Sequence, residues 1–285
     1  MGSRRVRFAS IAIAALVATT VSAAPAQALP VHPGPSYYLS LGDSLAYGYQ
    51  PNLVAAGAPP SAYRSYAEDF SSWIRSLALV NYGCPGETTT SLINGPCPWP
   101  QTGLHTPYAP ATTQLGAAEV FLTAHGAQTK LVTLDIGSND LLALVGACEA
   151  HPIPSLLGCL EGGLTATVGA IETNDYQILA TVRALAPSAR IVMFNLYNPI
   201  AIELPGSDTL IAAVNQALAG FLAGSASSLD VHLADAFGAI NGVAGSTLEQ
   251  ARICLLTWMC SSYANIHPTT LGYWSLTFAL IKALA

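Results

Sequence analysis

Short apolar runs alternate with longer segments of helical periodicity through most of the chain. The runs are rich in β-branched and aliphatic residues and almost continuously apolar, which is typical of strands covered on both faces of a sheet. We predict strands at Tyr37–Leu41, Leu79–Tyr82, Leu131–Asp135, Arg190–Asn195 and Val231–Asp235. Because strands that alternate with helices pair in parallel through right-handed crossovers, this pattern predicts an α/β protein with a parallel sheet between helical layers.

The segments between these runs carry apolar residues at helical spacing. We predict helices near Tyr66–Leu77, Thr112–His125, Leu164–Leu185 and Thr209–Ser227. A last helix follows His267, with Pro268 at its first position, where a missing N–H costs nothing. Its core-facing residues are expected to be Leu271, Trp274, Phe278 and Ile281. Trp258 is expected to lie in the core as well.

The N-terminal segment has a different pattern from the rest. Three arginines precede an uncharged, alanine-rich run, which ends at the A-x-A sequence Ala26-Gln27-Ala28. A basic region, an apolar region and a small-residue site in this order are typical of a secretory signal peptide. We therefore predict a signal peptide over residues 1–28 and a single domain over residues 29–285 of a secreted, extracellular protein.

The charge of the chain excludes some classes of function. Only 9% of its 285 residues are charged, and the net charge is −6. An acidic chain without basic clusters is a poor partner for nucleic acid or anionic headgroups, so we expect no nucleic-acid partner. The longest uncharged stretch after the leader, Thr209–Leu229, has the apolar spacing of an amphipathic core helix. We therefore expect no stable membrane anchor, and we expect a monomer.

Six cysteines follow the leader, in three close pairs that are 13, 11 and 6 residues apart. An even number of cysteines in an exported chain indicates disulfides, although six allow fifteen pairings. The short spacings favour pairing in sequence order, which is Cys84 with Cys97, Cys148 with Cys159, and Cys254 with Cys260. Metal binding is the alternative, but C-x-x-C and paired histidines at ligand spacing do not occur, so we expect no metal or organic cofactor.

Polar residues stand at the carboxyl ends of the predicted strands, the edge where parallel sheets bind ligands. Ser44 follows the first strand, Gly86 the second and Asn139 the third, and His267 precedes the last helix. Acyl transfer needs a nucleophile, a base and N–H donors for the developing oxyanion. Ser44 and His267 are the candidate nucleophile and base, and the N–H groups of Ser44, Gly86 and Asn139 are the candidate oxyanion hole.

Four blocks of sequence around these residues resemble the GDSL, or SGNH, family of serine hydrolases. They occur in the family's order and are LGDSLAYG (41–48), NYGCPGETT (81–89), DIGSND (135–140) and NIHPTTLGY (265–273). The resemblance implies a flavodoxin-like three-layer α/β/α fold with about five parallel strands. It also implies Ser44 as nucleophile, His267 as base, and Ser44, Gly86 and Asn139 as oxyanion hole. The G-x-S-x-G sequence of the α/β-hydrolases is absent.

The last block departs from the family pattern at the residue that orients the histidine. The family usually has Asp three residues before it, whereas this chain has Ala264. A backbone carbonyl near Ala264 can accept the imidazole N–H, which would make a Ser–His dyad. Alternatively, Asp235 at the end of the fifth strand can reach the imidazole, although a turn or capping role is favoured for it. A degenerate, inactive protein is a third alternative, and the intact Ser44, Gly86, Asn139 and His267 argue against it.

The expected function is the hydrolysis of small-molecule or lipid carboxylic esters through an acyl-enzyme. The sparse charge favours hydrophobic esters. Trp99 and Tyr108, in the Pro-rich loop after Gly86, are interpreted as a wall for the acyl chain, and Asp43 and Asp140 as residues that brace their loops. The alternatives are a carbohydrate O-deacetylase or an acyltransferase of the same family, or a secreted binding protein without catalytic activity.

Overall fold

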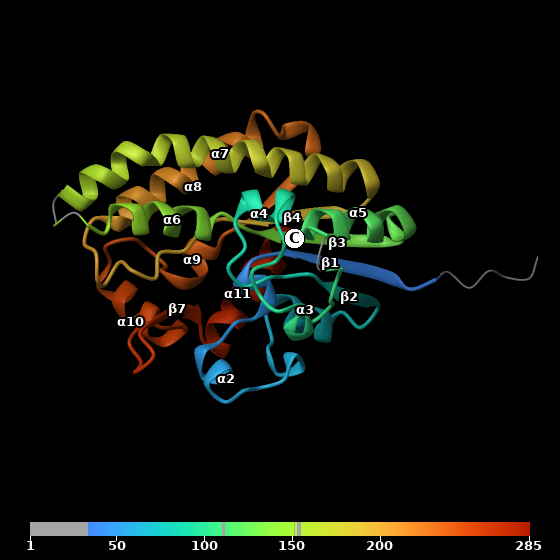
Figure 1. Ribbon diagram of the computed structural model, residues 1–285, viewed down its shortest axis with the longest axis horizontal. Helices are drawn as coiled ribbons and strands as arrows, with labels where there is room; N and C mark the ends of the chain where they lie inside the picture. The colour runs from blue at the N-terminus through green and yellow to red at the C-terminus, as the bar shows by residue number, and fades with distance from the viewer. Residues whose placement is uncertain (1–33, 110–111, 151, 153–154) are drawn as a thin grey trace, which may run out of the picture. The chain divides into compact units, whose positions relative to one another are not determined.

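Five parallel strands form the central sheet of the fold, in the order β2-β1-β3-β4-β5 (Figure 1). Their bounds are Ser36–Gly42 (β1), Leu77–Asn81 (β2), Thr129–Asp135 (β3), Arg190–Phe194 (β4) and Val231–Ala234 (β5). All five lie where the apolar runs predict strands, which confirms the α/β fold with a parallel sheet. Gly42 is opposite Asp135 in the register of β1 and β3, so the ends of these two strands lie side by side.

The structure, a computed structural model, describes residues 34–109, 112–150, 152 and 155–285. Gly34–Ala285 forms one compact unit. The predicted signal peptide, residues 1–28, lies outside the described residues and stays a prediction. Among the described helices, none combines the length and the apolar character needed to cross a bilayer.

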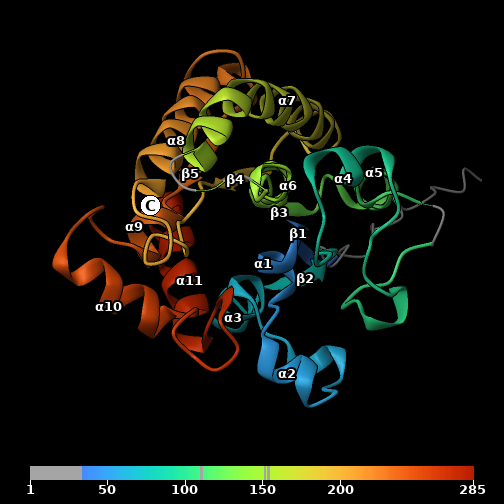
Figure 2. The same cartoon turned by 60° about the vertical axis from the view of Figure 1, so that its left-hand side comes forward.

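Helices cover both faces of the sheet, and the two views agree on which helices lie on which side (Figures 1 and 2). One layer contains α4 (Thr89–Asn94), α5 (Gln114–His125), α6 (Ser138–Cys148), α7 (Ser155–Leu185) and α8 (Ser207–Ala223). The other contains α3 (Tyr66–Trp73), α9 (Ala236–Ile240), α10 (Thr247–Leu256) and α11 (Thr270–Leu284). Two short helices, α1 (Ser44–Tyr47) and α2 (Pro51–Ala55), follow β1.

Alternate strand residues enter the two halves of the core. Leu39 and Leu41 of β1 pack with the layer of α5 and α7, whereas Tyr38 packs with α3 and α11. This alternation follows from the two-residue period of a strand. Because both faces are covered, the strands are apolar at successive positions, which is why they appear in the sequence as continuous apolar runs.

The last helix is rotated from the orientation that its sequence predicts. Leu271, Trp274 and Phe278 are about half exposed, at 48%, 47% and 54%, and the buried face instead includes Tyr273 and Leu280. The helix is apolar all round, so periodicity could not select the buried face. Gly272 selects it, because a Cβ at this position would lie 2.0 Å from the carbonyl oxygen of Leu256. The prediction that Leu271, Trp274 and Phe278 face the core is therefore wrong.

The start of this helix also differs from the prediction. Thr269 is the N-cap, and its side chain accepts a hydrogen bond from the backbone N–H of Gly272. Pro268 lies outside the helix, in a short antiparallel pair formed by β6 (Thr257–Trp258) and β7 (Asn265–Pro268). Trp258 is only partly buried. The β6–β7 pair holds His267 in extended backbone.

Three disulfides join neighbouring elements, and their pairing follows sequence order. Cys84 pairs with Cys97 across the loop after β2, Cys148 with Cys159 between α6 and α7, and Cys254 with Cys260 between α10 and the turn before β7. Each disulfide closes a short loop and therefore restricts a segment that the five-stranded sheet does not hold.

Candidate active site

The turn between β1 and α1 determines where Ser44 lies. Gly42 ends β1 at φ 139°, and a Cβ there would be 2.1 Å from the carbonyl oxygen of Asp135, so a side chain does not fit. Asp43 then caps α1, because its Oδ1 accepts the backbone N–H of Leu45 at 2.9 Å. Ser44 is consequently the first residue of α1, at the carboxyl end of β1.

Ser44, His267 and Asn265 form a chain of hydrogen bonds. Nε2 of His267 lies 2.8 Å from Oγ of Ser44, and Nδ1 lies 2.6 Å from Oδ1 of Asn265. The backbone N–H of His267 donates to the same Oδ1 at 3.1 Å. An amide oxygen can only accept, so Nδ1 carries the proton and Nε2 directs its lone pair at the serine hydroxyl.

The structure corrects the group expected to orient the histidine. Asn265 accepts the hydrogen bond from Nδ1, whereas the sequence predicted a backbone carbonyl near Ala264 or the carboxylate of Asp235 as the acceptor. Asp235 instead caps α9, accepting from the backbone N–H of Gly238 and from Nδ2 of Asn195, both at 2.9 Å. Ala264 lies in the turn before β7, in the left-handed region with φ 43°.

A signal for Asn265 was present in the sequence. In a strand, residues two apart project from the same face. Asn265 stands two residues before His267 in the block NIHP, and both lie in β7. Asn265 was missed because the family pattern has the orienting residue three positions before the histidine, not two.

The imidazole of His267 is closely packed. The ring of Tyr49 lies against it with 4.3 Å between the ring centroids. Burial removes water that would hydrate an imidazolium, and it lowers the pKa of His267 to about 4. The histidine is therefore neutral at physiological pH, which is the form that can accept a proton.

Gly86 comes from the loop after β2, and Asn139 from the first turn of α6, which follows β3. Pro85 and Gly86 form the centre of a β-turn that is closed by a 3.1 Å bond from the Glu87 N–H to the Cys84 carbonyl. Proline followed by a glycine at φ 86° is typical of a type II turn, and the turn's own hydrogen bond does not use the N–H of Gly86. Asn139 lines the same pocket as Ser44 and His267.

The side chain of Asn139 is held by two acceptors. Its Nδ2 donates to the backbone oxygen of Glu87 at 2.7 Å and to Oδ2 of Asp43 at 3.3 Å. The first bond links the first turn of α6 to the loop after β2, and the second links it to the turn that carries Ser44. Three separate segments are thus held at one edge of the sheet. Asp140, the next residue, accepts from Thr89 N and Oγ1 at 2.9 and 2.7 Å and so braces α4.

Two buried carboxyl groups lie behind Ser44. Oδ1 of Asp135 accepts the backbone N–H groups of Asp43 and Ala46, and its Oδ2 accepts the hydroxyl of Tyr66. Burial raises the pKa of Asp43 to about 6, and it raises the pKa of Asp135 well above its usual range, with the nearby Asp43 charge adding to the effect. These carboxyl groups brace the Ser44 turn.

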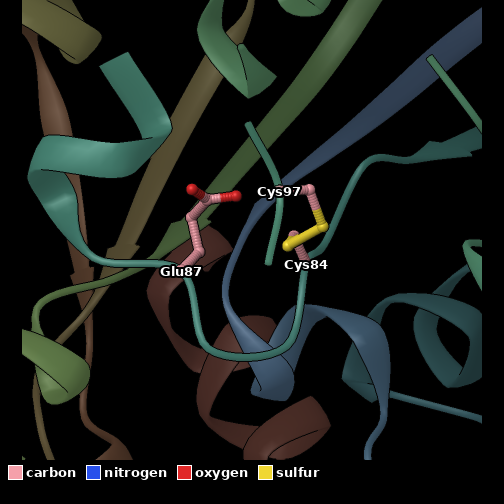
Figure 3. Close-up of side chains that lie close together, drawn as sticks. All are labelled: Cys84, Glu87 and Cys97. Carbon is pink, nitrogen blue, oxygen red and sulfur yellow. A yellow bond between two sulfur atoms is a disulfide. The ribbon is translucent and has the colours of Figure 1, made fainter. Parts of the chain in front are cut away.

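Glu87 and Cys84 lie on opposite arms of the loop after β2, and Cys84 is joined to Cys97, which lies on the segment after α4 (Figure 3). Their ligand atoms fall within 4.8 Å of one another, as a metal site requires. Both sulfurs are in the disulfide, however, so the cluster offers no thiolate ligand. The Glu87 carboxylate accepts from Ser91 Oγ at 2.6 Å, and burial raises its pKa to about 7.

An apolar pocket opens beside Ser44, Asn139 and His267. It encloses about 650 Å³, its open mouth included. Its apolar lining comes mainly from α6, α8 and the segment after β4, and includes Leu141, Leu142, Val145, Leu196, Ile200 and Ile211.

Trp99 and Tyr108 do not belong to this lining, which corrects their interpretation as the wall of an acyl site. Trp99 packs on Tyr49 with 5.9 Å between the ring centroids, and Tyr108 is buried against Tyr82. Trp99 therefore supports Tyr49, which packs on His267, whereas Tyr108 belongs to the hydrophobic core.

Comparisons with known structures identify the fold. Extracellular lipase from Streptomyces rimosus superposes with a TM-score of 0.54 at 17% identity, over 87% of this chain and 99% of that one. Phospholipase A1 from Streptomyces albidoflavus NA297 gives 0.55 at 19% identity, over 87% and 99%. Acetylxylan esterase from Geobacillus stearothermophilus gives 0.52 at 12% identity, over 88% and 94%. At these identities the likeness establishes the three-layer fold alone.

The sequence itself carries the family signature. Residues 40–274 match the GDSL-like Lipase/Acylhydrolase family, and this span includes all four blocks quoted above. No curated protein matches the sequence significantly. Because the family match covers most of the chain and agrees with the fold, this protein belongs to the GDSL-like Lipase/Acylhydrolase family of hydrolases.

Proposed function

We propose that this hydrolase cleaves carboxylic esters with Ser44 as nucleophile, His267 as general base and Asn265 as the residue that positions the histidine. The observation that carries the proposal is the bond chain from Ser44 Oγ to His267 Nε2 (2.8 Å) and from His267 Nδ1 to Asn265 Oδ1 (2.6 Å). A nucleophile bonded to a base, which is oriented by a third group, is the arrangement that serine hydrolases share.

The reaction follows from the protonation state of the histidine. Oγ of Ser44 attacks the ester carbonyl as its proton passes to Nε2 of His267. The imidazolium then gives that proton to the leaving alkoxide, which leaves the acyl group on Ser44. Water, deprotonated by the same Nε2, releases the acid. Oδ1 of Asn265 accepts the hydrogen bond from Nδ1–H throughout, and so fixes the ring and its tautomer without a carboxylate.

Three N–H groups are proposed to stabilise the oxyanion. They are the backbone N–H groups of Ser44 and Gly86 and the side-chain amide of Asn139. The proposal is supported by the position of Ser44 at the first turn of α1, where backbone N–H groups lack helical partners. It is also supported by the type II turn at Gly86, which leaves that N–H outside its own hydrogen bond. The 3.3 Å bond from Asn139 to Asp43 is long enough to give way to a substrate oxyanion.

The acyl part of the ester is proposed to enter the apolar pocket beside Ser44, which favours hydrophobic esters over charged ones.

Export to the extracellular space remains part of the proposal. It is supported by the signal-peptide pattern over residues 1–28 and by three disulfides, which persist in oxidising compartments. We propose that the exported protein acts without a metal or organic cofactor.

The test is labelling with an alkyl fluorophosphonate, followed by turnover of p-nitrophenyl esters. We expect the protein to be labelled and to hydrolyse esters, and Ser44→Ala to lose both properties while keeping its fold. Ser72→Ala is the matched control, because Ser72 lies on α3 and donates to the Asp69 carbonyl. A folded wild type that is neither labelled nor active would be a binding protein. Acyl transfer to an added alcohol or sugar in preference to water would indicate an acyltransferase, and activity confined to acetylated carbohydrate would indicate a deacetylase.

A further inference from the structure

The side chain of Gln114 lies fully buried behind the turn that carries Ser44. Gln114 is the first residue of α5, and the N-cap Thr113 fixes this end of the helix by accepting the backbone N–H of Gly116 at 3.0 Å. A glutamine with no exposed surface is uncommon, because its amide loses all hydration. Both polar groups of this amide therefore need partners inside the protein.

The amide of Gln114 pairs with the backbone of Gly42, the last residue of β1. Its Oε1 accepts the Gly42 N–H at 2.7 Å, and its Nε2 donates to the Gly42 carbonyl at 2.9 Å. Because an N–H can only donate, these partners fix which way the amide faces. The strand β2 ends opposite Ser40, so the amide supplies the acceptor that a longer β2 would have supplied to Gly42.

The same amide reaches the loop that carries Gly86. Its Nε2 also donates to Oε2 of Glu87 at 3.3 Å, and the other carboxyl oxygen of Glu87 accepts from Ser91 Oγ at 2.6 Å. Glu87 directly follows Gly86, and its backbone oxygen accepts from Nδ2 of Asn139 at 2.7 Å. One side chain thus joins the strand that leads into Ser44 to the residue that connects two of the proposed oxyanion donors.

We propose that Gln114 is a positioning residue for ester hydrolysis, which holds the turn of the nucleophile and the loop of the oxyanion hole at a fixed separation. This inference rests on the proposed function, because Gln114 acts on the reaction only through Gly42 and Glu87. Oxyanion donors must lie about 2.7–3.1 Å from the oxygen that becomes charged, and a displacement of about 1 Å can cost about 10²-fold in rate. Because the displaced groups act in the transition state, loss of the Gln114 contacts should lower kcat and leave KM nearly unchanged.

The experiment measures kcat and KM for p-nitrophenyl butyrate at pH 8 and pH 5, with active enzyme counted by fluorophosphonate labelling. Gln114→Met keeps a side chain of similar length but removes all three hydrogen bonds. We expect its kcat to fall about 10- to 100-fold, with KM within about twofold of the wild type. Gln101→Met is the matched control, because Gln101 also accepts a backbone N–H, that of Tyr108 at 3.0 Å, but lies in the loop before α5. We expect the control to keep the wild-type kcat.

Gln114→Glu gives a readout that a purely structural role would not move. The introduced carboxyl group has nearly the shape of the amide but, when ionised, has no proton to donate to the Gly42 carbonyl. Burial beside other carboxyl groups raises its pKa, so it is protonated at pH 5 and donates again. We expect kcat relative to the wild type to recover by about fivefold or more between pH 8 and pH 5, the value of one hydrogen bond. For Gln114→Met we expect the same ratio at both pH values.

Other titratable groups face Gly42 and Gln114 from the neighbouring segments. They are Asp43, Glu87, Tyr108 and Asp135. All of them are also present in Gln114→Met, so the ratio measured for that variant reports any effect of their own titration. A recovery confined to Gln114→Glu is therefore due to the introduced carboxyl group.

Gln114→Glu also covers the case in which Gln114→Met does not fold, since its protonated form keeps the shape of the wild type. A folded variant with wild-type kcat at pH 8, or a Gln114→Glu ratio that is the same at both pH values, would overturn the proposal. A kcat that falls only in step with the circular dichroism signal would make Gln114 a structural residue and overturn it as well. These outcomes leave the wild type active. Failure of the proposed function has a different signature, because the wild type would then hydrolyse no ester and Ser44 would not be labelled by a fluorophosphonate.

Discussion

Replacing Asn265 isolates the feature in which this site differs most from the usual family pattern. Asn265→Ala removes the acceptor of the His267 Nδ1 proton, a contact of 2.6 Å, and also the acceptor of the His267 backbone N–H. Asn265→Asp keeps an oxygen at the same position but adds a negative charge. The two variants therefore separate the loss of orientation from a change in electrostatics.

The size of each effect follows from the contacts. Leaving a buried donor unpaired costs about 1–3 kcal/mol, so kcat/KM for Asn265→Ala should fall about 5- to 150-fold. In Asn265→Asp the carboxylate stabilises the imidazolium, which raises the pKa of His267 from about 4 by about 1–3 units. The base acts only when neutral, so activity is lost below its pKa. The acidic limb of the wild type should lie near pH 4, and that of Asn265→Asp at higher pH.

The assay is kcat/KM for p-nitrophenyl butyrate as a function of pH, with circular dichroism to verify folding at each pH. Asn94→Ala serves as the control, because Asn94 is exposed at the end of α4. Wild-type kcat/KM in folded Asn265→Ala would refute the orienting role. An acidic limb that does not rise in Asn265→Asp would refute the assignment of that limb to His267.

Three further predictions concern the oxyanion hole and the stability of the fold. Asn139→Ala should lower kcat about 10²–10³-fold with little change in KM, whereas a raised KM at unchanged kcat would place Asn139 in substrate binding. Asp175 is fully buried with both oxygens unpaired among the described residues, and burial raises its pKa well above the usual range. Asp175 therefore keeps its proton in the folded state at pH values, above about 4, at which the unfolded state has lost it, so the stability of the wild type falls as pH rises. Asparagine does not titrate, so the gain in melting temperature from Asp175→Asn should be larger at pH 8 than at pH 5. An equal gain at both pH values would contradict this. Gly272→Ala should lower the free energy of unfolding in urea by more than about 1 kcal/mol, because its Cβ would lie 2.0 Å from the carbonyl oxygen of Leu256. An unchanged urea midpoint would show that the contact relaxes.

The sequence by itself determined the alternation of strands and helices. It also determined which strands carry candidate catalytic residues at their carboxyl ends. Strands buried on both faces must be apolar at successive positions, so five of them could be recognised without tertiary information. The carboxyl ends of parallel strands meet at one edge, which is why Ser44 and Asn139 could be expected in one site. The short cysteine spacings favoured the pairing that the structure contains, but only three-dimensional proximity selects one pairing of fifteen.

Only the tertiary structure decided the features that depend on how elements pack. Strand order is one, because periodicity within a strand carries no information about its neighbours. The rotation of α11 is another, since a helix apolar on all sides is oriented by the close approach of Gly272 to Leu256. The hydrogen-bond partner of His267 is a third such feature. It is Asn265, because the β6–β7 pair holds both residues in extended backbone on one face. The apolar pocket beside Ser44 is formed mainly by α6, α8 and the segment after β4, which are distant in sequence from Trp99 and Tyr108, so only the packing of the helical layer could place it there.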